Sequence, residues 1–368
     1  MKDLQKRTWA EVSLENIEHN YRAIRARLPK GCRFLGIVKA DAYGHGAVEV
    51  AKRLEKCGAD YLAIACLDEA LELRHSGVKM PILILGHTPP EYVKELLDND
   101  LTQTVSCEAK GVEYSEAATK LGGTLKIHIK LDTGMSRLGF LCAGGYFDEG
   151  VQSVIRTCKL PGIYAEGVYT HFAVSDYTDS ESIDYTKKQF ELFMHVINDA
   201  ERIGGFKFKI RHCANSGAVV NHPEMMLDMV RPGFLLYGYG DDGKLGLKPA
   251  MRMVSTVSTG TGVSYGRHYV TDKRTRMGVV AAGYADGIPW AAAGKCSYFT
   301  EGKFVPQCGN ICMDMSMVDL TDCPEVNVGS EVEIFGENAR IEKLAEAAGT
   351  IPYELLCAVS KRVPRIYK

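Results

Sequence analysis

Apolar positions in the first two thirds of the chain follow two alternating patterns, short continuous runs and longer stretches with helical spacing. The first helical stretch follows Ser13 and predicts a helix that is capped by Ser13, begins at Leu14 and extends to about Leu28. Beyond it, short apolar runs predict buried strands at residues 34–38, 61–65, 81–85, 101–105, 125–131, 163–169, 208–213 and 228–230.

Amphipathic segments separate these runs and predict helices at residues 47–56, 68–75, 91–97, 108–120 and 185–203. Alternation of strand and helix predicts parallel strands with helices outside them. Eight such units over about 240 residues match a (β/α)8 TIM-type barrel, an α/β fold. A doubly wound open sheet is the alternative, because periodicity alone does not exclude it.

After about Gly240 the pattern changes to β segments separated by glycine-rich turns. Strands are expected at residues 254–259, 277–282, 315–318 and 332–335, and short helices at 341–348 and 352–359. We therefore expect a barrel domain over residues 1–240 and a mainly β domain over residues 241–368. Pairing of the extreme N-terminal residues with the second domain is left open.

Composition narrows the class of ligand. The chain has 368 residues, 46% of them hydrophobic, and a formal net charge of -2 from 44 basic and 46 acidic residues. The even mixture of charges gives no footprint for nucleic acid or for an anionic membrane, so a small-molecule substrate is expected. Residues 1–10 lack the apolar region of a secretory signal, and no apolar run is long enough to span a bilayer, which favours the cytoplasm.

The 12 cysteines are scattered along the chain and are expected to be reduced, buried residues rather than a disulfide framework. Cys308 with Cys312, and His212 with Cys213, have no second pair at zinc-finger spacing. No metal site is expected.

Lys39 directly follows the first predicted barrel strand, at the end where barrel enzymes carry their catalytic groups. Partial desolvation there favours the neutral amine, which can form an imine with a carbonyl group. Tyr43 offers a phenol to a phosphate, and Gly44 and Gly46 permit a tight backbone path beside a ligand. The alternative is a lysine that simply extends from the barrel rim into solvent.

The stretch from Val38 to Gly46, Val-Lys-Ala-Asp-Ala-Tyr-Gly-His-Gly, resembles the cofactor motif of the alanine racemases. Further motifs of that family follow in order along nearly the whole chain. The resemblance implies an N-terminal eight-stranded barrel, a C-terminal β domain, and pyridoxal 5′-phosphate held by Lys39 as a Schiff base. On this interpretation the protein is an amino-acid racemase.

A second motif runs from Lys130 to Gly139 and contains Arg137. The spacing alone favours a solvated loop, but a guanidinium group can bind a substrate carboxylate with two hydrogen bonds. The resemblance assigns Arg137 to the substrate carboxylate and to the phenolic oxygen of the cofactor. It also implies carbamylation of Lys130, which would orient Arg137. His171 closes the sixth strand and, by resemblance, supports the catalytic tyrosine and the arginine at the pyridine nitrogen.

Two glycine-containing turns follow the seventh and eighth strands, where barrels commonly bind phosphate. Ser216, Gly233 and Phe234 fit that use, although ordinary turn structure also explains these residues. The resemblance places Arg231 against the pyridine nitrogen. Because arginine stays protonated and only donates hydrogen bonds, the pyridine nitrogen beside it must be unprotonated, which makes the ring a weak electron acceptor. Reprotonation at the α-carbon is then favoured over transamination.

Racemisation requires proton removal on one face and delivery on the other, so two bases are expected. The resemblance supplies Tyr265 as the partner of Lys39, Met313 as a backbone ligand of the substrate carboxylate, and Tyr353 near the cofactor phosphate. It places Tyr265 and Met313 of one subunit over the barrel of another, in a two-fold homodimer with shared active sites.

The sequence thus indicates an alanine racemase that interconverts L- and D-alanine and supplies D-alanine for peptidoglycan. The alternatives are a broader alanine and serine racemase, a barrel-type decarboxylase that uses the same cofactor, and a non-catalytic cofactor-binding barrel. Trp290 and Asn310 stand where the family usually carries arginines along the substrate access path, which leaves substrate range open.

Overall fold

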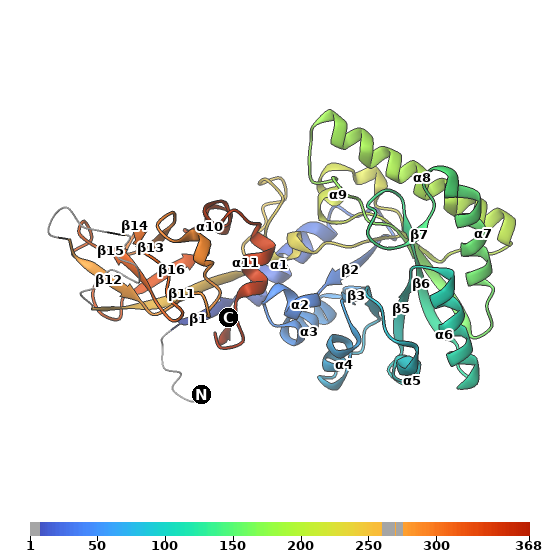
Figure 1. Ribbon diagram of the computed structural model, residues 1–368, viewed down its shortest axis with the longest axis horizontal. Coiled ribbons are helices and arrows are strands. Elements are labelled where there is room, and N and C mark those ends of the chain that lie inside the picture. Colours follow the sequence, from blue (N-terminus) through green and yellow to red (C-terminus); the bar gives the residue numbers. More distant parts are fainter. Residues whose placement is uncertain (1–7, 260–268, 270–274) are drawn as a thin grey trace. The chain divides into compact units, whose positions relative to one another are not determined.

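The computed structural model describes residues 8–259, 269 and 275–368. The chain divides into two compact units. The larger unit comprises Ile17–Ala40 and Ala47–Lys248, and the smaller comprises Met1–Asn16, Asp41–Gly46 and Pro249–Lys368. Figure 1 labels the elements of both.

The larger unit is built on eight parallel strands in the order β10-β2-β3-β4-β5-β6-β8-β9. Backbone hydrogen bonds from Asp228 N to Arg211 O (3.1 Å) and from Arg231 N to Ala214 O (2.9 Å) join the two end strands, so the sheet closes into a barrel. This excludes the open sheet and confirms all eight predicted strands. Their bounds are β2 Arg33–Ile37, β3 Tyr61–Ile64, β4 Ile82–Ile84, β5 Leu101–Val105, β6 Leu125–Asp132, β8 Ile163–Tyr169, β9 Ile210–His212 and β10 Met229–Val230, with the short β7 Phe140–Leu141 paired to β6.

Helices surround these strands (Figure 1). Strands β3, β4 and β5 are buried along their whole length, as parallel strands covered on both faces must be, which explains the continuous apolar runs of β3 and β4. The helices are α3 Ala47–Cys57, α4 Leu67–His75, α5 Val93–Asp98, α6 Glu108–Lys120, α7 Phe147–Cys158, α8 Ser180–Gly204 and α9 Ser216–Asn221, with 3-10 turns η1 Pro90–Tyr92, η2 Gly144–Tyr146, η3 Pro223–Met225 and η4 Phe234–Tyr237.

The first helix, α1 Leu14–Arg25, begins as predicted, because the Ser13 hydroxyl accepts a hydrogen bond from Asn16 N at 3.1 Å. Its predicted end at Leu28 is wrong. The hydrogen bond from Leu28 N to Arg25 O spans only three residues, so the chain tightens into a turn before Pro29, a residue that disfavours helix in the position before it.

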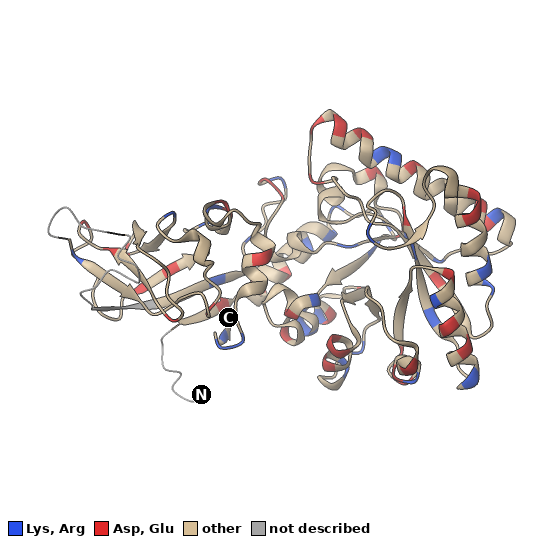
Figure 2. Cartoon of the chain, viewed as in Figure 1, with Lys and Arg blue, Asp and Glu red and all other residues tan. Residues whose placement is uncertain are grey.

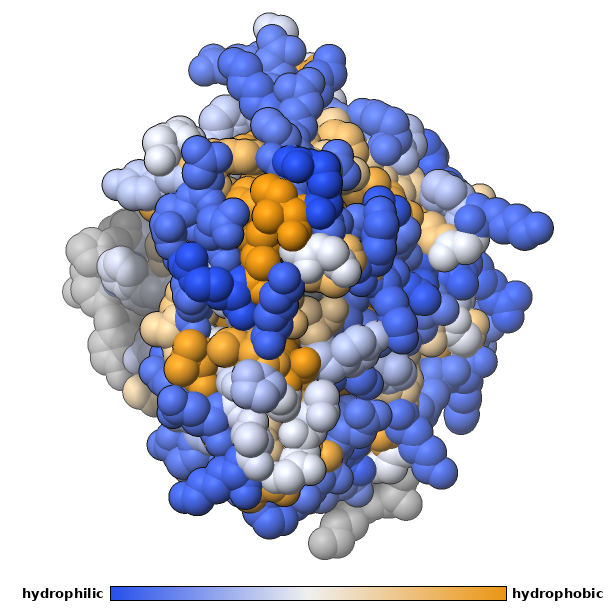
Figure 3. All heavy atoms as spheres, turned by 90° about the vertical axis from the view of Figure 1, so that its right-hand side faces the viewer, coloured by the Kyte–Doolittle hydropathy of each residue, from blue (hydrophilic) through white to orange (hydrophobic). Residues whose placement is uncertain are grey.

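The outer surface of the barrel carries no single-sign charge. Acidic and basic residues are interspersed along α6, α7 and α8 (Figure 2). The face of the molecule shown in Figure 3 is mostly hydrophilic, with small separate hydrophobic patches. Among the described residues, no helix has both the length and the apolar composition that a bilayer span requires.

The smaller unit is a mainly β structure. Among its described residues, eight strands lie in the order β12-β15-β14-β13-β16-β11-β1-β17. Strand β11 also pairs with β12, so six of these strands form a closed ring that β1 and β17 extend at β11. The elements are β1 Thr8–Val12, β11 Met251–Thr259, β12 Met277–Val280, β13 Ser297–Thr300, β14 Lys303–Cys308, β15 Ser316–Asp319, β16 Glu331–Phe335, β17 Arg365–Tyr367, α10 Ile341–Ala348, α11 Pro352–Ala358 and the 3-10 turn η6 Trp290–Ala292.

Candidate active site

Most of the predicted barrel residues follow the carboxyl ends of strands. Lys39 lies just beyond β2, Lys130 near the end of β6, His171 beyond β8 and Arg231 directly after β10. Burial holds the pKa of His171 well below its usual value, and the charges of Arg231, Lys130, Arg137 and Lys39 lower it further. The fold therefore brings the four predicted cations close enough to act on one imidazole.

Arg231 is only 4% exposed, and its guanidinium is saturated with partners. Nη1 donates to His212 O at 2.9 Å, and Nη2 donates to Thr170 O at 2.7 Å and to Cys213 O at 3.1 Å. The same two nitrogens lie 3.2 Å from His212 Nδ1 and 3.4 Å from His171 Nδ1. A planar group held at this many points is fixed in position.

Lys130 is buried beside aromatic and cationic groups, and its Nζ lies 5.2 Å from the centre of the Tyr169 ring. Burial and the charges of Arg231 and Arg137 lower the pKa of this amine to about 8, against the opposing charge of Asp132. Asp132 Oδ1 also accepts hydrogen bonds from Gly134 N and Ser136 N, both at 3.0 Å. These bonds shape the loop that carries the exposed Arg137.

The two predicted phosphate turns meet. The hydroxyl of Ser216, at the start of α9, accepts hydrogen bonds from Gly233 N at 3.0 Å and from Leu235 N at 3.4 Å. Asn215 caps α9 by accepting a hydrogen bond from Ala218 N at 3.1 Å. Ser216, Gly233 and Phe234, which begins η4, therefore lie together as predicted.

Residues 40–43 form a left-handed turn within α2 Lys39–Tyr43, with φ between 51° and 54° at all four positions. Such backbone costs about 1–2 kcal/mol per residue, so it must be held by its surroundings. Gly44 and Gly46 continue it at φ values of 79° and 90°. A Cβ at Gly44 would collide with the backbone oxygen of Leu356, which explains glycine there.

The smaller unit contains the remaining described site residues. Tyr43 is 9% exposed, burial raises its pKa above the ordinary value, and its ring lies edge-on to Tyr353 with centroids 5.7 Å apart. Met313 is 52% exposed. Tyr265 lies outside the described residues.

Three groups linked to Arg231 were not predicted: the buried His212 and His128, and the half-buried Glu166. The available signal was strand periodicity, because His128 lies two residues before Lys130 in β6 and therefore faces the same side. A polar residue at an inward-facing position of an otherwise apolar strand marks a buried hydrogen-bond network.

Comparison with known proteins agrees with this geometry. Residues 12–241 match the family model for the alanine racemase N-terminal domain, and residues 245–367 match that for the C-terminal domain. The chain belongs to the alanine racemase family. Enzymes of this family are isomerases that depend on pyridoxal 5′-phosphate, and the chain shares that reaction class and cofactor.

Two curated members of the alanine racemase family illustrate the extent of the match. Alanine racemase 1 of Clostridium acetobutylicum is 42% identical over 98% of this chain and 95% of its own length. Alanine racemase of Desulforamulus reducens is 41% identical over 98% of both chains. The solved alanine racemase of Clostridium difficile 630 is 38% identical, with a TM-score of 0.91, and the match covers 100% of this chain and 97% of that one.

The described barrel residues fit the alanine racemase cofactor. Lys39 supplies an amine, and Lys130, Arg137 and Arg231 supply positive charge around His171. Ser216 and the amides at Gly233 and Phe234 form a compact polar turn. Hydrogen-bond donors and cations of this kind suit the phosphate of the cofactor and the carboxylate of the substrate.

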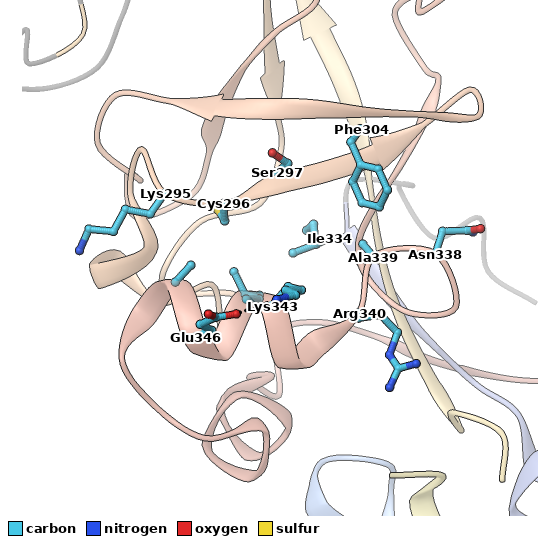
Figure 4. A pocket seen from close by; sticks show the side chains of 12 residues that line it. Lys295, Cys296, Ser297, Phe304, Ile334, Asn338, Ala339, Arg340, Lys343 and Glu346 are labelled. Carbon is cyan, nitrogen blue, oxygen red and sulfur yellow. Dashed lines mark hydrogen bonds and ion pairs between the residues drawn. The ribbon is translucent and has the colours of Figure 1, made fainter. Parts of the chain in front are cut away.

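A cleft of about 530 Å³ lies elsewhere in the smaller unit, between α10 and the sheet (Figure 4). Lys343 lines it from α10, Arg340 from the position just before α10, and Phe304 and Ile334 from strands. No predicted alanine racemase site residue lines this cleft, so it is separate from the candidate active site.

The buried imidazoles predict a steep acid destabilisation. Burial lowers the pKa values of His128, His171 and His212, so below an unfolded value of about 6.5 only the unfolded chain takes up these protons. Stability is therefore complete above that pH and is lost as pH falls through it. The three imidazoles together lower the free energy of unfolding by up to about 4 kcal/mol per pH unit, at about 1.4 kcal/mol each.

Urea denaturation at about pH 7.5 and pH 5.5 measures this loss. The exposed His75 provides the control, since His75→Gln should leave the pH dependence unchanged. Equal free energies of unfolding at the two pH values would contradict the assignment of neutral buried imidazoles.

Proposed function

We propose that this chain interconverts L-alanine and D-alanine by a two-base mechanism that uses pyridoxal 5′-phosphate. The observation that carries the proposal is Arg231, a buried guanidinium whose described partners are carbonyl oxygens and imidazoles. When bound, the cofactor supplies a conjugated ring that accepts electron density from the α-carbon. A permanently protonated group at the ring nitrogen restrains that withdrawal, which favours return of a proton to the α-carbon.

The side chains divide the remaining work. Lys39 anchors the cofactor and moves a proton at Nζ on one face of the substrate, acting on the D-enantiomer. Tyr265 serves the opposite face and acts on the L-enantiomer. Arg137 and the Met313 amide hold the substrate carboxylate, and His171 supports Tyr265 and Arg231.

The cofactor phosphate is assigned to Ser216, Gly233, Phe234, Tyr43 and Tyr353. Ser216, Gly233 and Phe234 provide a hydroxyl and backbone amides, and Tyr43 and Tyr353 provide phenols. The shared contact of Ser216 Oγ with Gly233 N supports this assignment, as does the edge-on packing of the two tyrosines.

We further propose a homodimer in which Tyr265 and Met313 complete the partner's site. Large apolar side chains of the smaller unit are exposed, which supports a protein interface. They are Tyr284, Trp290, Met313, Met315 and Ile351, with exposures of 45%, 59%, 52%, 43% and 59%.

The physiological setting is also a proposal. All twelve cysteines are free, which supports a reducing compartment such as the cytoplasm. The relatives named above are bacterial, and the D-alanine formed there would supply peptidoglycan.

Lys130 is proposed to be carbamylated. Its lowered pKa, about 8, leaves part of the amine neutral and able to bind carbon dioxide, and the resulting anion would pair with Arg137. Wild-type protein in ¹³C-bicarbonate should show a carbamate carbon resonance that Lys130→Ala lacks. The exposed Lys56→Ala is the control. The same spectrum from all three proteins would refute the modification at Lys130.

Substrate range is tested by an enantiomer assay over a panel of small amino acids, including serine. Alanine should exchange fastest, and no carbon dioxide should be released. Preferential exchange of serine would favour the broader racemase, in keeping with Trp290 and Asn310. Release of carbon dioxide would favour the decarboxylase, and bound cofactor without any exchange would favour a non-catalytic binding protein.

A further inference from the structure

A continuous row of buried polar side chains runs through the barrel interior to Arg231. Glu166 Oε2 lies 3.6 Å from His128 Nε2, and His128 Nδ1 lies 2.9 Å from His212 Nε2. His212 Nδ1 in turn lies 3.2 Å from Arg231 Nη1. Both imidazoles are fully buried, and the Glu166 side chain is 17% exposed.

The chemistry of the donors gives this row a direction. Arginine only donates, so His212 Nδ1 must accept and its proton must reside on Nε2. That proton is donated to His128 Nδ1, so the His128 proton must also reside on Nε2, facing the Glu166 carboxylate. At 3.6 Å the last contact is electrostatic rather than a normal hydrogen bond. A single carboxylate thus favours the same tautomer in two successive rings.

Neighbouring residues keep this row in place. Tyr61 donates a hydrogen bond of 2.8 Å to Glu166 Oε2, and Tyr169 stacks on His212 with ring centroids 4.8 Å apart. A Cβ at Gly167 would lie 2.7 Å from His128 Cε1, so glycine leaves room for that ring. The surrounding residues therefore leave a space that fits the His128 ring.

Charge supports the same interpretation. The fully buried Arg231 has no carboxylate among its contacts in the described part of the chain. Burial raises the pKa of Glu166, but the N–H of His128 that faces it and the hydrogen bond from Tyr61 outweigh that effect and lower the pKa below its ordinary value, so the carboxylate stays ionised. Burial also lowers the pKa of both imidazoles and keeps them neutral. Glu166 is then the ionised end of the row that begins at Arg231.

We propose that Glu166 is a positioning residue that acts through His128 and His212 to keep the Arg231 guanidinium aimed at the barrel mouth. The negative charge polarises two neutral rings in series, which strengthens His212 Nδ1 as an acceptor for Arg231. The consequence for turnover rests on the proposed function, in which Arg231 faces the cofactor ring. The tautomers and the polarisation of the two rings do not depend on the proposed function.

Glu166→Gln in the holoenzyme removes the charge while retaining an oxygen acceptor for Tyr61. In ¹⁵N-histidine-labelled protein, both proteins should show His128 and His212 protonated on Nε2, because Arg231 still donates to His212 Nδ1. The variant should show changed ¹⁵N chemical shifts in both rings, because the polarising charge is gone. With alanine as substrate, kcat should fall about tenfold, the scale of support from a residue behind a functional group, with KM changed less than about twofold.

Two further variants separate positioning from packing. Glu166→Asp keeps the charge and should retain ¹⁵N chemical shifts close to those of wild type and most of kcat. Glu201→Gln removes another buried carboxylate of the same unit, one that accepts a hydrogen bond from Phe208 N, and should change neither readout. Unchanged ¹⁵N chemical shifts of His128 and His212 in Glu166→Gln, even with lower kcat or stability, would overturn the proposal. Changed ¹⁵N chemical shifts in both rings of a protein that does not racemise alanine would uphold the polarised row and refute the proposed function instead.

Discussion

Replacing Lys39 by alanine is expected to lower alanine racemisation by at least roughly four orders of magnitude. The change removes two functions together, the amine that anchors the cofactor and the base on one face of the substrate. Neighbouring amines cannot substitute, because Lys130 is buried under Tyr169 and its position in β6 is fixed. Chiral chromatography of alanine incubated with the purified variant measures the loss.

The anchoring function has an independent readout. Borohydride reduction of wild-type holoenzyme should fix the cofactor to the peptide that contains Lys39, and the variant should yield no such peptide. Lys56→Ala, at the exposed end of α3, is the matched control and should behave as wild type in both assays. Racemisation by Lys39→Ala at a rate near that of wild type would exclude Lys39 as the catalytic lysine.

Tyr265→Phe is expected to lower racemisation by about two to four orders of magnitude, because it removes the proposed second base and leaves the ring. The proposed dimer adds a sharper expectation. Inactive Lys39→Ala and Tyr265→Phe chains, dissociated and reassociated together, should regain about a quarter of wild-type activity, since half of the dimers are mixed and each has one intact site.

The control for this experiment is each variant carried alone through the same dissociation and reassociation. Neither should regain activity. If Tyr265 instead served the barrel of its own chain, every site in the mixture would lack one base. Recovery of no activity by the mixture would therefore contradict sharing of the site between subunits.

The barrel was predictable from sequence because its strands are buried on both faces. The runs at residues 61–65 and 81–85 are continuously apolar, and they became β3 and β4. Strands β1, β13, β14 and β17 of the smaller unit were missed. In β14, exposed and buried residues mix without clean alternation, so the sequence carries little periodic signal.

The candidate site likewise contains residues that the sequence predicted and residues that it missed. Lys39 and Arg231 were predicted because motifs surround them, and Ser216 and Gly233 because glycine-rich turns follow strands. His128 and Glu166 belong to strands β6 and β8, where only their polarity distinguishes them from core residues. Their meaning comes from contacts across the barrel, at sequence separations that local patterns do not encode.

Racemisation of L-alanine in deuterium oxide tests the central claim most directly. Two bases on opposite faces predict that, at low conversion, the D-alanine formed carries deuterium at the α-carbon while the remaining L-alanine still carries hydrogen. Mass spectrometry after chiral separation reads both pools. D-alanine that retains the original hydrogen, or a complete absence of D-alanine, would contradict a two-base racemase.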